Sequence, residues 1–163
     1  MEPDIFADRN ALSIALAQLN SHLGNVSANC RKLLEIRERA AAQRADIIVT
    51  PEMFLSGYPA DDLVLRSDFM SRIEAAIATL ATATTDGGPA LIVGAPFRDG
   101  DVLYNSAFVL DGGAIVARRD KVNLPNYGVF DDKRHFNAGS LQGPVLLRGM
   151  RLGIAICEDI WFQ

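Results

Sequence analysis

Residues 151–161 read RLGIAICEDIW, an apolar run that ends at a cysteine and continues directly into acidic residues. A short apolar run followed by polar residues is typical of a strand that ends at the edge of a sheet. A fold can expose a nucleophile in this way. The run therefore predicts a strand over residues 151–156 that delivers Cys157 to a polar turn.

Two other apolar runs also lead into ionisable residues. Residues 47–49 read IIV and are followed closely by Glu52, and residues 114–117 read AIVA and continue to Lys121. A cysteine thiol with its ordinary pKa of about 8.5 is mostly protonated at neutral pH, so it requires a base or a cation. A carboxylate, an ammonium and a thiol that each follow a strand therefore predict a site for acyl transfer.

Each of these residues also has an ordinary structural explanation. Cys157 could be an inert buried thiol, because free cysteine is among the most buried residue types. Glu52 could be a solvated loop carboxylate, and Lys121 a surface lysine. A Cys–His enzyme is the weaker alternative, because His22 lies in a polar turn and His135 in a basic stretch.

The chain alternates strand-like and helix-like patterns in its first half and is mostly strand-like afterwards. This order favours an α/β fold that begins with parallel strands and becomes a mixed sheet through its later hairpins. Two long loops, residues 51–66 and 120–141, follow strands, where ligand crevices of open α/β sheets lie. The expected strands are 11–19 (buried), 46–50, 90–94, 102–110, 114–118, 145–147 and 151–156, with helices from Asn25 as cap to 41 and from Ser67 as cap to 80.

The composition fits a packed domain: 163 residues, of which 49% are hydrophobic and 22% charged. The net charge of −4 gives no reason to expect nucleic acid or a membrane as partner, and no apolar stretch is long enough to span a bilayer. Residues 1–8 are acidic and unlike a secretory signal, and Cys30 and Cys157 make no disulfide framework. These features predict a cytoplasmic protein.

The sequence gives no support for a metal ion or a nucleotide bound by these residues. Two cysteines and two histidines are scattered without metal-ligand spacing. Neither a Gly-x-Gly-x-x-Gly pattern nor a glycine-rich phosphate loop is present in the sequence.

Three segments in order resemble the motifs of the nitrilase, or carbon–nitrogen hydrolase, superfamily. They are residues 51–66, which begin PEMFLSGYP; residues 121–136, KVNLPNYGVFDDKRHF; and residues 153–161, GIAICEDIW. The same segments are similar, more narrowly, to the glutamine-hydrolysing domains of glutamine-dependent NAD synthetases. The resemblance covers the chain from residue 11 onward.

This resemblance implies an α-β-β-α sandwich and a catalytic triad of Glu52, Lys121 and Cys157. By similarity, Cys157 attacks the side-chain amide carbon of glutamine and forms a glutamyl thioester. Glu52 takes the thiol proton, passes it to the departing ammonia and then activates the hydrolytic water. Lys121 and the backbone N–H of Glu158 would hold the oxyanion.

The resemblance also implies further residues around the substrate. Tyr58 and Tyr127 are candidates for lining the glutamine pocket, with packed loop aromatics as the alternative, and Glu158 is placed with them. The family carries a second glutamate after the lysine, and Asp132 stands at the matching position. Its side chain is one methylene shorter, so its role is left open.

The resemblance further implies that this chain is part of a larger protein. By resemblance, residues 1–163 are the N-terminal portion of a nitrilase-like domain that is incomplete at its C-terminus. A synthetase domain of the same polypeptide would follow and use ATP and Mg²⁺, whereas this chain would hold no cofactor. An apolar sheet face left uncovered predicts association, and we expect a homo-oligomer.

Two other functions remain open. A stand-alone amidase or nitrilase of the same superfamily would share the triad and differ in its pocket and partner. A catalytically inert fragment would use its exposed sheet only for assembly.

Overall fold

The first half of the chain alternates strands and helices, and its strands run parallel. Within residues 11–161, which the computed structural model describes, the order is β1 (Ile14–Leu16), α1 (Val26–Ala42), β2 (Ile47–Val49), α2 (Ser67–Ala83) and β3 (Ala90–Asp99). β1 pairs with β2 and β2 with β3, both in parallel. The predicted parallel beginning of an α/β fold is confirmed.

The sheet continues with antiparallel strands. β4 (Val102–Asp111) pairs antiparallel with β3, and β5 (Ala114–Asp120) pairs antiparallel with β4, which gives the order β1-β2-β3-β4-β5. The predicted mixed sheet and the hairpin at residues 111–113 are confirmed. β3 extends beyond the predicted end at Gly94 because residues 95–99 pair with β4, and Gly100 with φ +57° makes a turn that was not predicted.

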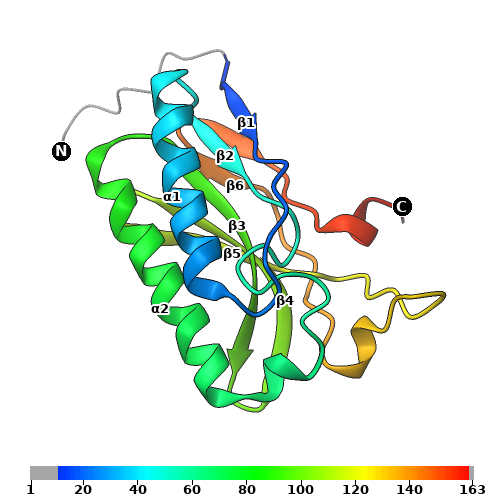
Figure 1. Ribbon diagram of the computed structural model, residues 1–163. Helices are drawn as coiled ribbons and strands as arrows, with labels where there is room; N and C mark the ends of the chain where they lie inside the picture. The colour runs from blue at the N-terminus through cyan, green and yellow to red at the C-terminus, as the bar shows by residue number, and fades with distance from the viewer. Residues whose placement is uncertain (1–10, 162–163) are drawn as a thin grey trace.

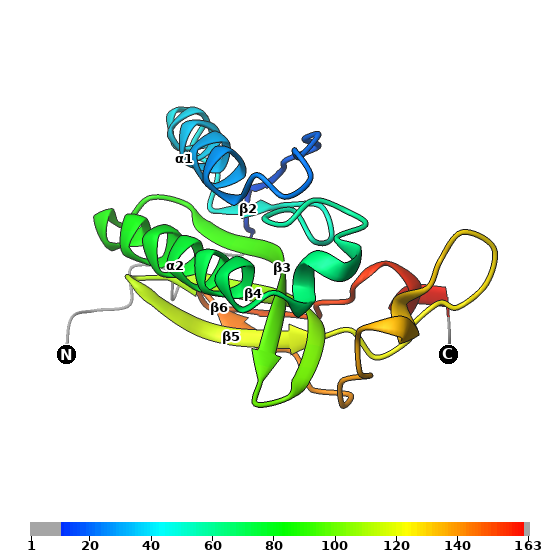
Figure 2. The same cartoon turned by 60° about the horizontal axis from the view of Figure 1, so that its bottom comes forward.

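Both helices lie side by side on one face of this sheet (Figures 1 and 2). α1 begins at the predicted cap, where Asn25 Oδ1 accepts a hydrogen bond from the N–H of Ala28 at 3.2 Å. In α2 the prediction was wrong by one residue, since Arg66 occupies the cap position and Ser67 is the first helical residue.

Alternate residues of the central strands point to opposite faces of the sheet and enter two separate cores. On β3, Leu91 and Val93 pack with the helices, whereas Ala90 and Ile92 lie on the other face. That second face is covered by a two-stranded sheet, β6 (Val145–Leu147) and β7 (Met150–Leu152). The described residues thus form three of the layers of the predicted α-β-β-α sandwich: helices, large sheet and small sheet (Figure 2).

The prediction of a strand over residues 151–156 was wrong in extent. β7 ends at Leu152, and residues 153–156 have no regular structure. They still cross the second face of the sheet, where Ile154 and Ile156 pack in the second core. A 3-10 helix, Cys157–Trp161, follows and begins at the thiol.

The prediction of a buried strand over residues 11–19 was also wrong. β1 contains only three residues, and Leu16 is 70% exposed. β1 is an edge strand with β2 as its neighbour in the sheet, and Ile14 and Leu16 lie on the face opposite the helices. The apolar composition of the run therefore reflects one packed face, through Ala15, and not burial on both.

Several large apolar side chains are exposed in the described chain, among them Leu16, Leu146, Ile160 and Trp161. Residues 1–8, on which the prediction of no secretory signal rests, lie outside the described residues. No helix within residues 11–161 combines the length and apolarity that a membrane span requires. Cys30 is buried and Cys157 exposed, and both are free thiols.

Candidate active site

Glu52 stands in the turn that follows β2, and the backbone of β3 holds that turn closely. A Cβ added to Gly94 would lie 2.5 Å from the carbonyl oxygen of Pro51 and 2.6 Å from the nitrogen of Met53. The Gly94 N–H donates to Thr50 Oγ1 at 3.0 Å, and its carbonyl accepts from the Leu55 N–H at 3.1 Å. The missing side chain of Gly94 is therefore what lets the Glu52 turn sit against the sheet.

Lys121 directly follows β5 and points into the protein. Its backbone N–H donates to the carbonyl of Asn105 on β4 at 2.8 Å, and its carbonyl accepts from the N–H of Gly139 at 2.8 Å. The side chain is only 1% exposed. A buried ammonium is costly unless it is paired, so its partners define the site.

Two carboxylates pair with the Lys121 ammonium. Nζ lies 2.7 Å from Glu52 Oε1 and 2.7 Å from Asp132 Oδ2. Burial alone would lower the pKa of Lys121, but the hydrogen bonds and charges of Asp132 and Glu52 outweigh it and raise that pKa above its usual value. Lys121 is therefore a cation and a hydrogen-bond donor at neutral pH, and not a base.

Asn105 also holds Glu52, a contact that the sequence reasoning missed. Its Nδ2 donates to Glu52 Oε1 at 2.6 Å, the same oxygen that accepts from Lys121. Because Oε1 takes both donors, the geometry allows Oε2 to accept a further one. Asn105 is buried, and its Oδ1 finds no hydrogen-bond partner within residues 11–161.

Cys157 opens its 3-10 helix with φ +45°, a left-handed conformation that is uncommon for a residue with a side chain. Partial burial of the thiol, the charge of Glu52 and a hydrogen bond with Glu52 raise the pKa of Cys157, while the charge of Lys121 opposes them. The thiol is therefore protonated at neutral pH and interacts with the carboxylate that could remove its proton.

A cavity of about 360 Å³ gives access to this pair. Glu52 and Cys157 both line it, together with Gly94, Ser106 and residues 154–156. A volume of this order suits a small-molecule substrate. The thiol of Cys157, the carboxylate of Glu52 and the segment that precedes Cys157 thus line the same cavity.

The two predicted tyrosines take different places. The Tyr58 hydroxyl donates to Asp132 Oδ1 at 3.2 Å, and burial and the charge of Asp132 raise the pKa of Tyr58. The exposed Tyr127 donates to Glu158 Oε1 at 2.8 Å, and this hydrogen bond raises the pKa of Tyr127. Tyr127 and Glu158 line a neighbouring cavity of about 440 Å³.

The structure therefore brings Glu52, Lys121, Asp132 and Tyr58 into one hydrogen-bonded network. Cys157 lies at its margin, and Asp132 reaches Lys121 despite its shorter side chain. Within residues 11–161, no group of three or more His, Cys, Asp or Glu side chains is arranged to hold a metal ion. The arrangement offers a nucleophile, a base and a cation for acyl transfer.

The sequence profile of the family described as carbon-nitrogen hydrolase matches residues 13–163. The chain belongs to the carbon–nitrogen hydrolase family. The predicted resemblance is confirmed by relatives of known class. A glutamine-dependent NAD(+) synthetase from Rhodobacter capsulatus is 42% identical over 91% of this chain, and one from Thermotoga maritima is 39% identical over 92%.

Solved structures of the family have the same fold. The glutamine-dependent NAD+ synthetase from Acinetobacter baumannii, in complex with adenosine diphosphate, matches 92% of the chain with a TM-score of 0.86 and 39% identity. An amidase from Nesterenkonia sp. matches 94% with a TM-score of 0.81 and 30% identity. A mutant of that amidase carries acrylamide, added at its active site cysteine.

The chain spans about a quarter of the synthetases that it resembles. It covers 27% of the Rhodobacter relative, 26% of the Thermotoga relative and 28% of the Acinetobacter structure, against 59% of the amidase. The predicted domain limits stay a prediction, as do the catalytic roles of the individual residues in this member of the family.

Gly94 and Asn105 are site residues that the motif search missed. Asn105 did leave a signal, since it and Ser106 are polar residues within the mostly apolar strand of residues 102–110. Gly94 left a weaker one, because a glycine within a strand often marks close backbone approach. Neither signal indicates that the residue contacts Glu52 or the turn that carries it.

Proposed function

We propose that this chain hydrolyses the side-chain amide of glutamine through a thioester on Cys157 and releases ammonia for NAD synthesis. The observation that carries the proposal is the Lys121 ammonium held 2.7 Å from Glu52, while Glu52 and Cys157 line the same cavity. The relatives' description as glutamine-dependent NAD(+) synthetases supports glutamine as the substrate.

In the first half of the proposed reaction, Glu52 takes the thiol proton while the sulfur of Cys157 attacks the amide carbon. The carbonyl oxygen becomes an oxyanion. An ammonium has three N–H donors, and Glu52 and Asp132 accept from two, so the third can face the oxyanion together with the Glu158 N–H. Collapse expels ammonia, which leaves with the proton from Glu52.

In the second half, Glu52 accepts a proton from water as the water oxygen attacks the thioester carbon. The carbon–sulfur bond breaks, glutamate leaves, and the proton returns from Glu52 to the sulfur of Cys157. Asp132 stays ionised beside Lys121 and keeps that cation in place. Glu52 thus serves both halves, which requires it to keep its position throughout.

Ammonia release from glutamine by the protein that carries this chain tests the proposal. Cys157→Ala should abolish the release, and Lys121→Ala should lower kcat by about 10²–10³, the loss that follows removal of one oxyanion donor. Lys32→Ala is a matched control, because the Lys32 ammonium donates to the carbonyl of Asn20 at 2.7 Å, outside the site. Release that survives Cys157→Ala would contradict the proposal.

A second candidate is a stand-alone amidase that acts on another short amide or a nitrile. The structural match to an amidase over 94% of the chain favours it specifically. Measuring kcat/KM for glutamine against a panel of short aliphatic amides and nitriles separates the two. A preference for glutamine supports the glutaminase, and equal or better turnover of acetamide or propionamide supports the amidase.

We also propose that ammonia passes to a synthetase activity of the same polypeptide, where ATP and Mg²⁺ would be used. The relatives' name supports this partner. Glutamine-dependent formation of NAD from its deamido precursor, lost in Cys157→Ala but restored by added ammonia, would support it. If Cys157→Ala also lost the ammonia-driven reaction, the proposal that ammonia is released and used at separate sites would be contradicted.

A further inference from the structure

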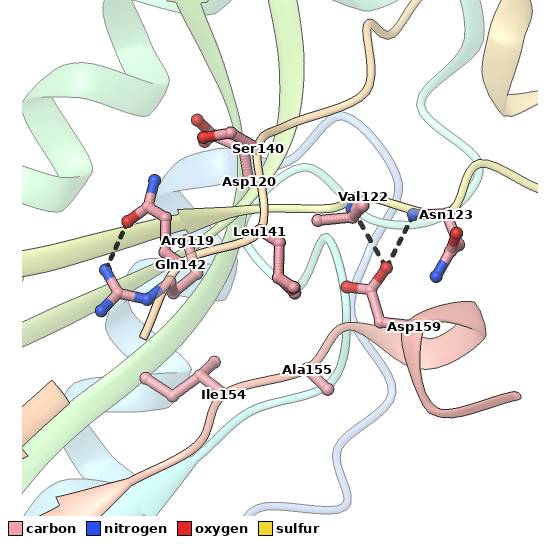
Figure 3. Close-up of a pocket in the computed structure, with 10 residues that line it drawn as sticks. All are labelled: Arg119, Asp120, Val122, Asn123, Ser140, Leu141, Gln142, Ile154, Ala155 and Asp159. Carbon is pink, nitrogen blue, oxygen red and sulfur yellow. Dashed lines mark hydrogen bonds between the residues drawn. The ribbon is translucent and has the colours of Figure 1, made fainter. Parts of the chain in front are cut away.

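Asp159 connects the two segments that carry Lys121 and Cys157. Its Oδ1 accepts hydrogen bonds from the N–H groups of Val122 at 3.0 Å and Asn123 at 2.7 Å (Figure 3). Its Oδ2 accepts from the N–H of Ile156 at 3.0 Å. One carboxylate thus satisfies three backbone donors in two chain segments.

Each of these donors lies beside a residue of the proposed site. Val122 directly follows Lys121, and Ile156 directly precedes Cys157. Neither segment is in a strand at this point, because β5 ends at Asp120 and β7 at Leu152. Strand pairing therefore does not fix the spacing between the two segments, and the Asp159 carboxylate bonds to the backbone of both.

The conformation of Cys157 strengthens this dependence. With φ +45°, its backbone lies in a region that L-residues avoid unless the surroundings hold them there. The Ile156 N–H bond to Asp159 Oδ2, together with the Asp159 N–H bond to the Ile156 carbonyl at 3.1 Å, encloses the residue. Both bonds depend on the position of Asp159.

We propose that Asp159 is a positioning residue that holds the Cys157 thiol against Glu52 and Lys121. This proposal rests on the proposed function only in taking Cys157 as the nucleophile. Asp159 itself touches no reacting atom in this account. Its carboxylate acts through the backbone on either side of the site.

Loss of this link should change the thiol in a defined direction. In the intact site, burial, the charge of Glu52 and the charge of Glu158 raise the pKa of Cys157, and Lys121 alone opposes them. A Cys157 segment that moves away from the site loses its burial and the charges of Glu52 and Lys121, while Glu158 moves with it, and the net result is a fall of the pKa toward its ordinary value. The thiol then becomes more reactive towards a simple alkylating agent while it becomes a poorer catalyst.

The test is the rate of iodoacetamide alkylation of each cysteine across pH 6.5–10 (roughly the range over which thiols titrate), followed by peptide mass spectrometry. Asp159→Asn disrupts one arm of the link in either amide orientation, because an amide has a single acceptor oxygen. Alkylation of Cys157 at pH 8 should become roughly threefold faster or more. Buried Cys30 reports global unfolding in the same sample.

Asp46→Asn is the matched control, since Asp46 Oδ2 also accepts a backbone hydrogen bond, from Ser13 at 2.8 Å, outside the site. The proposal predicts faster alkylation of Cys157 in Asp159→Asn alone, with Cys30 protected in all samples. An unchanged Cys157 profile in Asp159→Asn overturns it. Equal acceleration of both cysteines also overturns it, because the link would then stabilise the fold and not the site. The alkylation assay contains no glutamine, so its outcome is independent of whether the chain proves to be a glutaminase.

Discussion

At the scale of single residues, the site depends on one buried cation shared by two carboxylates. Lys121 is 1% exposed and lies 2.7 Å from both Glu52 and Asp132, so it cannot leave without stranding two negative charges. Partial burial and the charge of Glu52 in turn raise the pKa of the Cys157 thiol, which is therefore protonated at neutral pH. The same carboxylate, Glu52, therefore keeps the thiol of Cys157 protonated and is placed to remove its proton.

Glu52→Gln should separate these two effects. It removes the negative charge and the strong acceptor that raise the pKa of Cys157, while the charge of Lys121 continues to lower it. The pKa of the thiol should fall, and alkylation by iodoacetamide at pH 7.5 should become faster. Glutamine hydrolysis should nevertheless fall by about 10²–10⁴, the usual contribution of a general base. Glu74→Gln, on the exposed face of α2, should leave both rates unchanged.

Lys121→Met should reveal the coupling of this network to folding. Breaking a buried ion pair on one side costs about 3–5 kcal/mol, so the free energy of unfolding by urea should fall by that order at pH 7. A smaller loss in the double variant Lys121→Met/Asp132→Asn would show that the stranded charge is the cause. Equal stability of the single variant and the parent would contradict the described network.

The same variant gives a pH test with a defined sign. The pKa of Lys121 is raised in the folded state, so its contribution to stability is complete below the unfolded pKa of about 10.4 and is lost as pH rises through the higher folded value. The parent should lose stability above that pH. Tyr58 contributes with the same sign, since its pKa is raised as well. The difference between parent and Lys121→Met should therefore shrink in alkali, and a difference that grows would be contrary to this account.

At the scale of elements, strand ends place Glu52 and Lys121 of the candidate site, whereas a loop places Cys157. The ends of β2 and β5 put Glu52 and Lys121 at one side of the sheet, as the sequence predicts from apolar runs that end in ionisable residues. The prediction that a strand delivers Cys157 was wrong, since β7 ends five residues before it. Apolar residues 153–156 pack on the sheet without pairing in it, and hydrophobicity alone does not distinguish the two arrangements.

Gly94→Ala should disturb the loop that carries Glu52. The new methyl group would meet the backbone of Pro51 and Met53 at 2.5–2.6 Å, contacts that only a shift of the turn or of β3 can relieve. We expect stability to fall by about 1–3 kcal/mol and kcat to fall with Glu52 displaced. Gly143→Ala is a matched control, because nothing lies within 4 Å of a Cβ there. Unchanged kcat in Gly94→Ala would mean that the close approach does not position the base.

At the scale of the whole molecule, the sequence predicts the family and the sheet but not the contacts between residues that are distant in the chain. The family and the residues around Lys121 follow from the three segments, and the mixed sheet follows from the order of helix-like and strand-like patterns. Asn105 and Asp159, in contrast, act through contacts 53 and 36 residues apart. Such contacts depend on how the sheet brings the loops together, which periodicity does not reveal. The same holds for β1, whose exposed Leu16 follows from its edge position and not from its composition.

Self-association is the prediction that belongs to this scale. Leu146 of the small sheet is 70% exposed, whereas its neighbours Val145 and Leu147 are buried and Leu147 packs in the second core. Sedimentation velocity should show a species larger than the monomer for the parent chain. Leu146→Lys should lower its share, while Lys133→Ala, in a short 3-10 helix outside the small sheet, should not. A parent that stays monomeric at about 100 μM, far above the Kd of a specific oligomer, would contradict the expected homo-oligomer.

The central claim is that Glu52 and Lys121 together make Cys157 the nucleophile for a glutamine amide. The most direct measurement is covalent labelling by a diazoketone analogue of glutamine, with the modified residue mapped by mass spectrometry. The account predicts one adduct, on Cys157, slowed by glutamine and lost in Glu52→Gln and Lys121→Ala. A folded protein that forms no adduct, or that labels Cys157 equally fast without Glu52, would contradict it.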